Sequence, residues 1–148
     1  MAKANCQNKN RKVGVSLRRM EAVAEYALNA LKKGNAEVNI VFVGNKKICS
    51  LNRKYLASKK TTDVIAFWEE EAAKSPENGM VFMGDVAIST DKAVENAKKF
   101  GTALNEEIAL YVIHGILHLA GFDDIDEKDR KIMERKQNEL LEKYKKVL

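Results

Sequence analysis

Apolar residues recur every three or four positions in five segments of the chain, which is the spacing of amphipathic helices. These segments predict helices at residues 17–33, 48–55, 90–100 and 106–120, and a last helix after Asp126. Three shorter segments, rich in β-branched and aromatic residues, predict strands at 37–43, 63–68 and 80–89. Because helices and strands do not alternate regularly, the pattern indicates an α+β fold in which a small mixed β-sheet is packed by helices.

The chain of 148 residues has the size of one domain. Residues 1–12 are polar, without hydrophobic periodicity, and are interpreted as a flexible basic arm; residues 13–148 are predicted to form a single domain. The arm has no feature of a secretory signal, and no apolar run is long enough to span a membrane. Cys6 and Cys49 lie far apart, which argues against a disulfide framework. We therefore expect a cytoplasmic protein without membrane association.

The formal net charge of +5 is unevenly distributed along the sequence. Residues 1–60 hold fourteen Lys or Arg against three acidic residues, whereas residues 61–148 hold twelve against eighteen. Six basic residues and no acidic one lie between Lys46 and Lys60. Such a density suits a surface that contacts phosphates, although a solvated lysine-rich face has the same composition. Charge alone leaves both interpretations open.

The two histidines of the protein, His114 and His118, lie four residues apart in the most apolar predicted helix. This spacing places both imidazoles on one face, about one turn apart, where two nitrogens can bind one cation. The alternative is a pair of core histidines that hydrogen-bond to backbone carbonyls. Burying two imidazoles without partners is costly, so the helix requires something that compensates them.

Gly121 ends this helix and can adopt a left-handed conformation without steric penalty. The chain can then turn back and bring Asp123 and Asp124 toward the histidines. Two imidazoles and a carboxylate leave one tetrahedral position open, as in catalytic zinc sites. Zinc makes water at such a position more acidic, which supplies hydroxide near neutral pH. The sequence therefore predicts a metal site on a buried helix and the turn after it.

The segment His114–Asp124 resembles the H-G-x-L-H-L-x-G-[YF]-D-H signature of the YbeY family of bacterial rRNA maturation factors, and ten of its eleven positions fit. Three upstream segments, Leu51–Tyr55, Thr62–Phe67 and Met83–Ile88, resemble the family blocks L-N-x-x-Y-R, P-T-[DN]-V-L-S-F and L-G-D-I-x-I. The blocks occur in family order and at family spacing. The histidine motif is the specific one, and the others support it.

The resemblance implies a zinc-dependent, single-strand-specific endoribonuclease that acts in 16S rRNA 3′-end maturation and ribosome quality control. It implies one Zn²⁺ per chain, with His114, His118 and Asp124 as ligands. Single-stranded RNA and rRNA are the implied partners, together with components of the small ribosomal subunit. The implied fold is the same small mixed sheet packed by helices.

Three positions depart from the family pattern. Asp124 replaces the usual third histidine, and its negative charge should make bound water less acidic. Leu56 replaces an arginine that would hold phosphate or stabilise developing charge. Thr61 replaces a proline ahead of a predicted strand. These changes keep open a catalytically weakened ribosome-assembly factor in which the metal is structural.

Basic residues near Leu56 are candidates to replace the missing guanidinium. We predict that Arg53, Lys59 and Lys60 bind RNA, with Lys54 as a further candidate; plain solvated side chains are the alternative. Two residues, Asp85 and Thr62, are predicted to line the cleft. The nucleophile could be hydroxide or an RNA 2′-hydroxyl, and the sequence does not distinguish them.

A zinc peptidase is a second enzyme class with histidines at positions i and i+4. Those enzymes carry a glutamate directly after the first histidine as general base, whereas this chain has Gly115. The sequence therefore disfavours proteolysis. Asp123 is expected to hold the turn or orient a ligand rather than act as a base.

Overall fold

The computed structural model describes residues 1–56, 63–68 and 79–147. In chain order, its elements are β1 (Lys3–Asn8), α1 (Leu17–Ala30), β2 (Ala36–Val43), α2 (Asn45–Leu56), β3 (Val64–Trp68), β4 (Val81–Ser89), α3 (Thr90–Phe100), α4 (Leu104–Leu119) and α5 (Glu127–Val147). The predicted helices and the three predicted strands are present, each with ends within a few residues of the expected ones. In the described part of the chain, no helix is both long and apolar enough to cross a bilayer.

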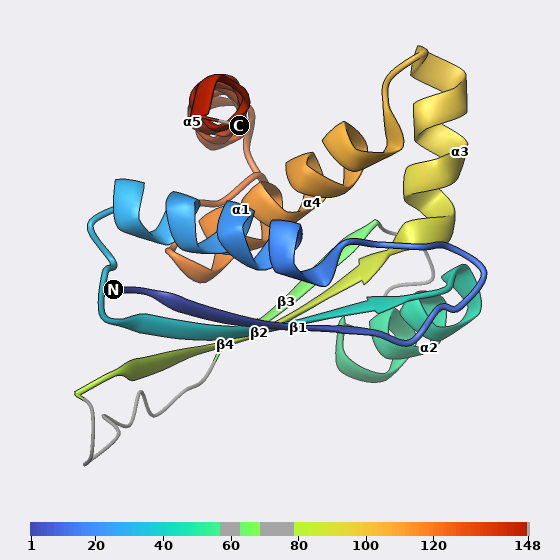
Figure 1. The fold of residues 1–148 in the computed structure, drawn as a ribbon, viewed down its shortest axis with the longest axis horizontal. Helices are drawn as coiled ribbons and strands as arrows, with labels where there is room; N and C mark the ends of the chain where they lie inside the picture. Colours follow the sequence, from blue (N-terminus) through green and yellow to red (C-terminus); the bar gives the residue numbers. More distant parts are fainter. Residues whose placement is uncertain (57–62, 69–78, 148) are drawn as a thin grey trace.

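The four strands form one mixed sheet in the order β1-β2-β4-β3. β1, β2 and β4 run parallel, and β3 pairs antiparallel with β4 at the other edge. α1, α3 and α4 lie over one face of this sheet, whereas α2 lies on the opposite side (Figure 1). α5 packs on α4 and α1 and forms an outer layer (Figure 1). This arrangement confirms the predicted α+β class with helices packed on a small mixed sheet.

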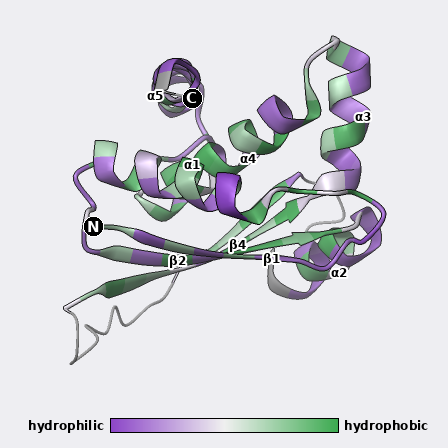
Figure 2. Ribbon diagram, viewed as in Figure 1, coloured by the Kyte–Doolittle hydropathy of each residue, from purple (hydrophilic) through white to green (hydrophobic). Residues whose placement is uncertain are grey.

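The main core lies between the sheet and the helices on its covered face. Alternate strand residues point into it, as the two-residue period of a strand requires. Its fully buried members include Val38, Ile40, Phe42, Val86, Ile88, Ile108, Val112, Ile113, Ile116 and Leu117. Figure 2 shows α4 mostly hydrophobic and α5 mostly hydrophilic, which agrees with an inner and an outer helix. α4 is thus the buried element on which both histidines lie.

The prediction of a flexible arm at residues 1–12 was wrong, because β1 occupies Lys3–Asn8 and pairs with β2. Small and polar residues make up this strand, and it has no β-branched residue that would signal its conformation. Its outer edge is satisfied by α1: the Ala4 amide donates to Glu25 (3.0 Å) and the Cys6 amide donates to Glu21 (2.9 Å). The strand is therefore held by backbone pairing on one side and helix carboxylates on the other.

Replacing Glu25 with alanine should lower the free energy of unfolding by about 1–2 kcal/mol, because the Ala4 amide loses its acceptor in a partly buried setting. Glu25→Gln keeps an oxygen acceptor and should recover most of this loss. Urea unfolding of the three proteins measures the effect. Equal stability of the alanine variant and the wild type would show that the helix carboxylate does not secure the strand.

Candidate metal centre

Gly115 lets α4 pack directly on the sheet. A Cβ atom at this position would lie 2.5 Å from Cγ1 of Val86 and 3.3 Å from Cγ1 of Val64, so only glycine fits without a shift. The helix face that carries Gly115 is thus pressed on β3 and β4. The two histidines lie on another part of the surface, where the side chains of His114 and His118 remain 30% and 19% exposed. They are held by a rigid helix yet open to solvent.

The chain reverses directly after α4, as the sequence predicts. Gly121 takes a left-handed conformation with φ of 100°. The Gly121 amide donates to the His118 carbonyl (3.0 Å), and the Phe122 amide donates to Leu117 (2.9 Å), which satisfies carbonyls at the helix end. Beyond this turn, Asp123 accepts a hydrogen bond from the Ile125 amide at 3.0 Å and so fixes the loop. Asp123 holds the turn, as expected from the sequence.

The reversal brings Asp124 to the two imidazoles. The Nε2 atoms of His114 and His118 lie 3.1 Å apart, and Oδ2 of Asp124 lies 3.7 Å from the first and 3.5 Å from the second. A tetrahedral zinc ion with ligand distances of about 2.0–2.1 Å separates neighbouring ligand atoms by about 3.4 Å. The three observed separations bracket this value. The group could therefore hold a metal ion.

Hydrogen bonds on the far sides of the two rings determine which nitrogens face the centre. Nδ1 of His114 lies 2.7 Å from Oε1 of Gln137; because a carboxamide oxygen only accepts, this nitrogen carries the proton. The His118 ring is hydrogen-bonded to the Phe122 backbone, an interaction that favours a proton on that side of the ring. In neutral rings these tautomers leave both Nε2 atoms unprotonated, so that three acceptors converge without a donor among them. A cation is what such a cluster binds.

The pKa of His118 supports the same protonation state. Burial lowers this pKa below its ordinary value, and the neighbouring His114 lowers it further, while Asp124 opposes the shift. The neutral imidazole is the form that binds a metal, so burial prepares His118 as a ligand. No proton has to be displaced from its Nε2 near neutral pH.

Gln137, on α5, is a functional candidate that the sequence did not reveal. It lies in a polar stretch of an exposed helix, where a glutamine carries no signal, and only the packing of α5 on α4 brings it to His114. Hydrogen bonds of this kind fix the tautomer and the orientation of metal-binding histidines. The side chain of Gln137 therefore orients the His114 ring in the candidate centre.

Replacing Gln137 with alanine should weaken metal binding about tenfold to a hundredfold, because His114 loses the partner that orients its ring. Gln137→Glu keeps an oxygen acceptor toward Nδ1 and should retain most of the affinity. Competition with a chromophoric zinc chelator measures both variants against the wild type. An unchanged affinity in the alanine variant would assign Gln137 to packing only.

A cavity of about 360 Å³ adjoins the candidate ligands. It is lined by Asp63, Val64, Leu110, Tyr111, His114, Asp124 and Gln137. Burial raises the pKa of the Tyr111 hydroxyl, so this group does not ionise readily. Its oxygen accepts a hydrogen bond from the side-chain amide of Asn96. The cavity thus opens on the metal group from the side of β3 and α5, and it is the space available to a substrate there.

Of the other predicted site residues, those that the structure describes, Arg53, Lys54 and Asp85, do not line this cavity. Arg53 is exposed on α2, beside a separate hollow that also involves Lys46 and Lys54. Lys59, Lys60 and Thr62 lie outside the described residues. The prediction that Asp85 lines the cleft was wrong, because alternate residues of β4 face opposite sides of the sheet and Asp85 faces away from α4.

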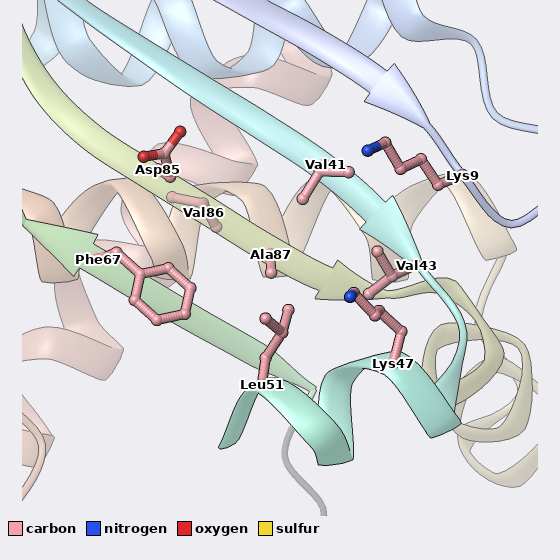
Figure 3. Close-up of a pocket in the computed structure, with 9 residues that line it drawn as sticks. All are labelled: Lys9, Val41, Val43, Lys47, Leu51, Phe67, Asp85, Val86 and Ala87. Atoms are coloured by element: carbon pink, nitrogen blue, oxygen red, sulfur yellow. The ribbon is translucent and has the colours of Figure 1, made fainter. Parts of the chain in front are cut away.

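Asp85 instead borders a hollow of about 430 Å³ on the other face of the sheet (Figure 3). Its floor is apolar, with Phe67 of β3 and Leu51 of α2 among its members, and Lys9 and Lys47 lie at one end (Figure 3). Among the described residues that line this hollow there is one carboxylate and no histidine or cysteine. Two imidazoles and a carboxylate adjoin the other cavity, which is therefore the catalytic candidate.

The fold and the site define a class: an α+β protein in which two imidazoles and a carboxylate form a group that could hold a metal ion. The family model for Endoribonuclease YbeY matches residues 5–145, so the chain belongs to this family. The membership confirms the predicted family and the predicted enzyme class, a nuclease.

Individual relatives agree with the family match. Endoribonuclease YbeY of Caldicellulosiruptor bescii is 35% identical over 147 residues, covering 92% of this chain and 93% of the relative. Endoribonuclease YbeY of a Geobacillus species is 41% identical over 115 residues, covering 74% and 73% of the two chains. The solution structure of TM1509 from Thermotoga maritima superposes with a TM-score of 0.62 at 28% identity, over 97% of this chain and 89% of that one.

Proposed function

We propose that the protein is a zinc-dependent, single-strand-specific endoribonuclease that acts in 16S rRNA 3′-end maturation and ribosome quality control. One Zn²⁺ per chain binds to His114, His118 and Asp124. The observation that carries this proposal is the convergence of three hydrogen-bond acceptors, two Nε2 atoms and one carboxylate oxygen, within 3.7 Å of one another. Membership in the endoribonuclease YbeY family supports the choice of RNA as substrate.

A bound zinc ion supplies Lewis acidity, which makes water more acidic and stabilises negative charge on a phosphate. The protein holds and orients the side chains that bind the metal. α4 and the turn at Gly121 hold the three ligand side chains, and Gln137 keeps the proton of His114 on Nδ1. Asp123 fixes the backbone that follows the third ligand. These contacts position the donor atoms before substrate arrives.

A zinc peptidase does not fit this site. The position that a peptidase gives to its catalytic glutamate is Gly115, whose Cα faces Val86 and Val64 inside the core. A glutamate at this position would be buried against the sheet, away from the cavity that the histidines face. The packing of α4 on the sheet is thus a second argument against proteolysis, besides the absence of a glutamate at position 115.

The proposed partners are single-stranded RNA, rRNA and components of the small ribosomal subunit, and the proposed location is the cytoplasm. Arg53 contacts the phosphates of the single-stranded RNA, together with Lys59 and Lys60, which follow it in the sequence. Support comes from α2, which exposes Lys46, Arg53 and Lys54 around one hollow and contains no acidic residue. Contacts of this kind make RNA affinity fall steeply with salt.

The test is cleavage of single-stranded fragments of 16S rRNA by purified, zinc-loaded protein, with the same sequences in duplex form for comparison. We expect cleavage of the single strands alone, and its loss when the metal is removed with a chelator. Binding of the single strands without cleavage, in protein that contains one zinc per chain, would favour an assembly factor with a structural metal instead.

A further inference from the structure

Trp68, the single tryptophan of the chain, contacts the backbone of the helix that carries both candidate histidine ligands. It is the last residue of β3, and its indole Nε1–H donates a hydrogen bond to the backbone carbonyl of His118 at 3.1 Å. Its side chain is nevertheless 56% exposed, one of few large hydrophobic residues on the surface of the described chain. A large aromatic ring is thus held at a fixed place next to a metal-ligand residue, with much of its surface in water.

The position of Trp68 in the strand explains its exposure. Val64 and Ala66 precede it on the same face of β3 and pack against the main core. Trp68 continues this face at the end of the strand, level with the carboxyl-terminal turn of α4, where its indole N–H donates to the His118 carbonyl. Its partner on the neighbouring strand is Gly84, which has no side chain to cover it.

We propose that Trp68 stacks on an unpaired base of single-stranded RNA beside the phosphate held at the metal centre. This inference rests on the proposed function and identifies a positioning residue for its substrate. Unpaired bases offer flat faces for stacking on aromatic side chains, and such stacking tolerates any base. The hydrogen bond to His118 already fixes the ring, so less conformational freedom is lost when a base binds.

A second exposed apolar side chain lies in the turn after α4. Ile125 follows Asp124 directly and is 88% exposed. Exposed apolar side chains thus occur at the end of β3 and in the turn that also carries Asp124. Apolar side chains suit the faces and edges of unpaired bases rather than a charged backbone. A base-paired duplex hides its base faces and cannot use Trp68, which gives a physical basis for single-strand preference.

Because Trp68 is the sole tryptophan, its fluorescence reports directly on the proposed contact. The zinc-loaded protein is titrated with a short single-stranded oligoribonucleotide, and emission is read before appreciable cleavage. We expect saturable quenching by the single strand and little change with the matching duplex. Steady-state cleavage then compares Trp68→Leu with the wild type. We expect the leucine variant to raise KM about tenfold or more, with kcat nearly unchanged.

Two further variants separate stacking from structural support. Trp68→Phe keeps an aromatic face without the N–H donor and should retain most of the wild-type KM. Phe100→Leu removes another exposed aromatic side chain, at the end of α3, and should leave KM unchanged. Zinc affinity is measured for every variant. Loss of zinc by Trp68→Leu would overturn the proposal, because Trp68 would then support the metal ligands.

The outcomes distinguish this inference from the proposed function. Normal cleavage by Trp68→Leu, or unchanged fluorescence at saturating single strand, would overturn stacking while the nuclease assignment stands. Quenching by the single strand without any cleavage would support stacking and contradict the nuclease assignment. Absence of both quenching and cleavage in zinc-loaded wild-type protein would overturn both.

Discussion

The His118→Ala variant should lose stoichiometric zinc binding and cleave single-stranded RNA about a hundredfold or more slowly than the wild type. His118 is the more buried of the two imidazoles, and its Nε2 lies within 3.5 Å of both other ligand atoms. Removing it leaves two donors, which bind zinc weakly. The chemistry then loses several kcal/mol of charge stabilisation, and each 1.4 kcal/mol is about a factor of ten in rate.

Zinc content by elemental analysis and the cleavage rate measure this effect. Asp85→Asn is the matched control, because this carboxylate lies on the other face of the sheet (Figure 3) and should affect neither quantity. Circular dichroism shows whether the variant keeps its helices. One zinc per chain in folded His118→Ala protein would mean that the metal binds elsewhere.

Gly115→Ala should lower the free energy of unfolding by about 2 kcal/mol, the largest loss of stability that we expect from a single added carbon. Alanine improves helix propensity by about 1 kcal/mol. The added Cβ, however, would lie 2.5 Å from Cγ1 of Val86 in a fully buried contact, and overpacking costs up to about 3 kcal/mol. The steric cost therefore outweighs the gain in propensity. Urea unfolding measures the difference.

Gly14→Ala is the control for this substitution, because no atom lies within 4 Å of an added Cβ there. It should be neutral or slightly stabilising, since alanine restricts the unfolded chain. Combining Gly115→Ala with Val86→Ala should cost less than the sum of the two single changes, because each relieves the other. Additive effects would show that the contact with Val86 is not the cause.

The metal group was predictable because its parts are local in sequence. Two histidines four residues apart share a helix face in any regular helix, and Gly121 signals where that helix can turn. The third ligand follows within six residues of His118. No long-range contact had to be known, so the sequence specified which side chains meet. The separations of 3.1–3.7 Å between ligand atoms required the structure.

The features that sequence analysis missed depend on contacts between distant segments. β1 contains no strand-forming residues and owes its conformation to β2 and to the carboxylates of α1. Gln137 reaches His114 across 23 positions of the chain, and Trp68 reaches His118 across 50. Each of these residues is ordinary in its local context. Their roles arise from packing, which local pattern does not encode.

The central claim, that one zinc ion held by this group drives RNA cleavage, is tested most directly by titrating metal-free protein with zinc while cleavage of a single-stranded RNA is followed. We predict that activity is absent at first, rises with added zinc and reaches its plateau at one equivalent per chain. Full cleavage activity before any metal is added, or a cleavage rate that stays the same as zinc is added, would contradict the claim.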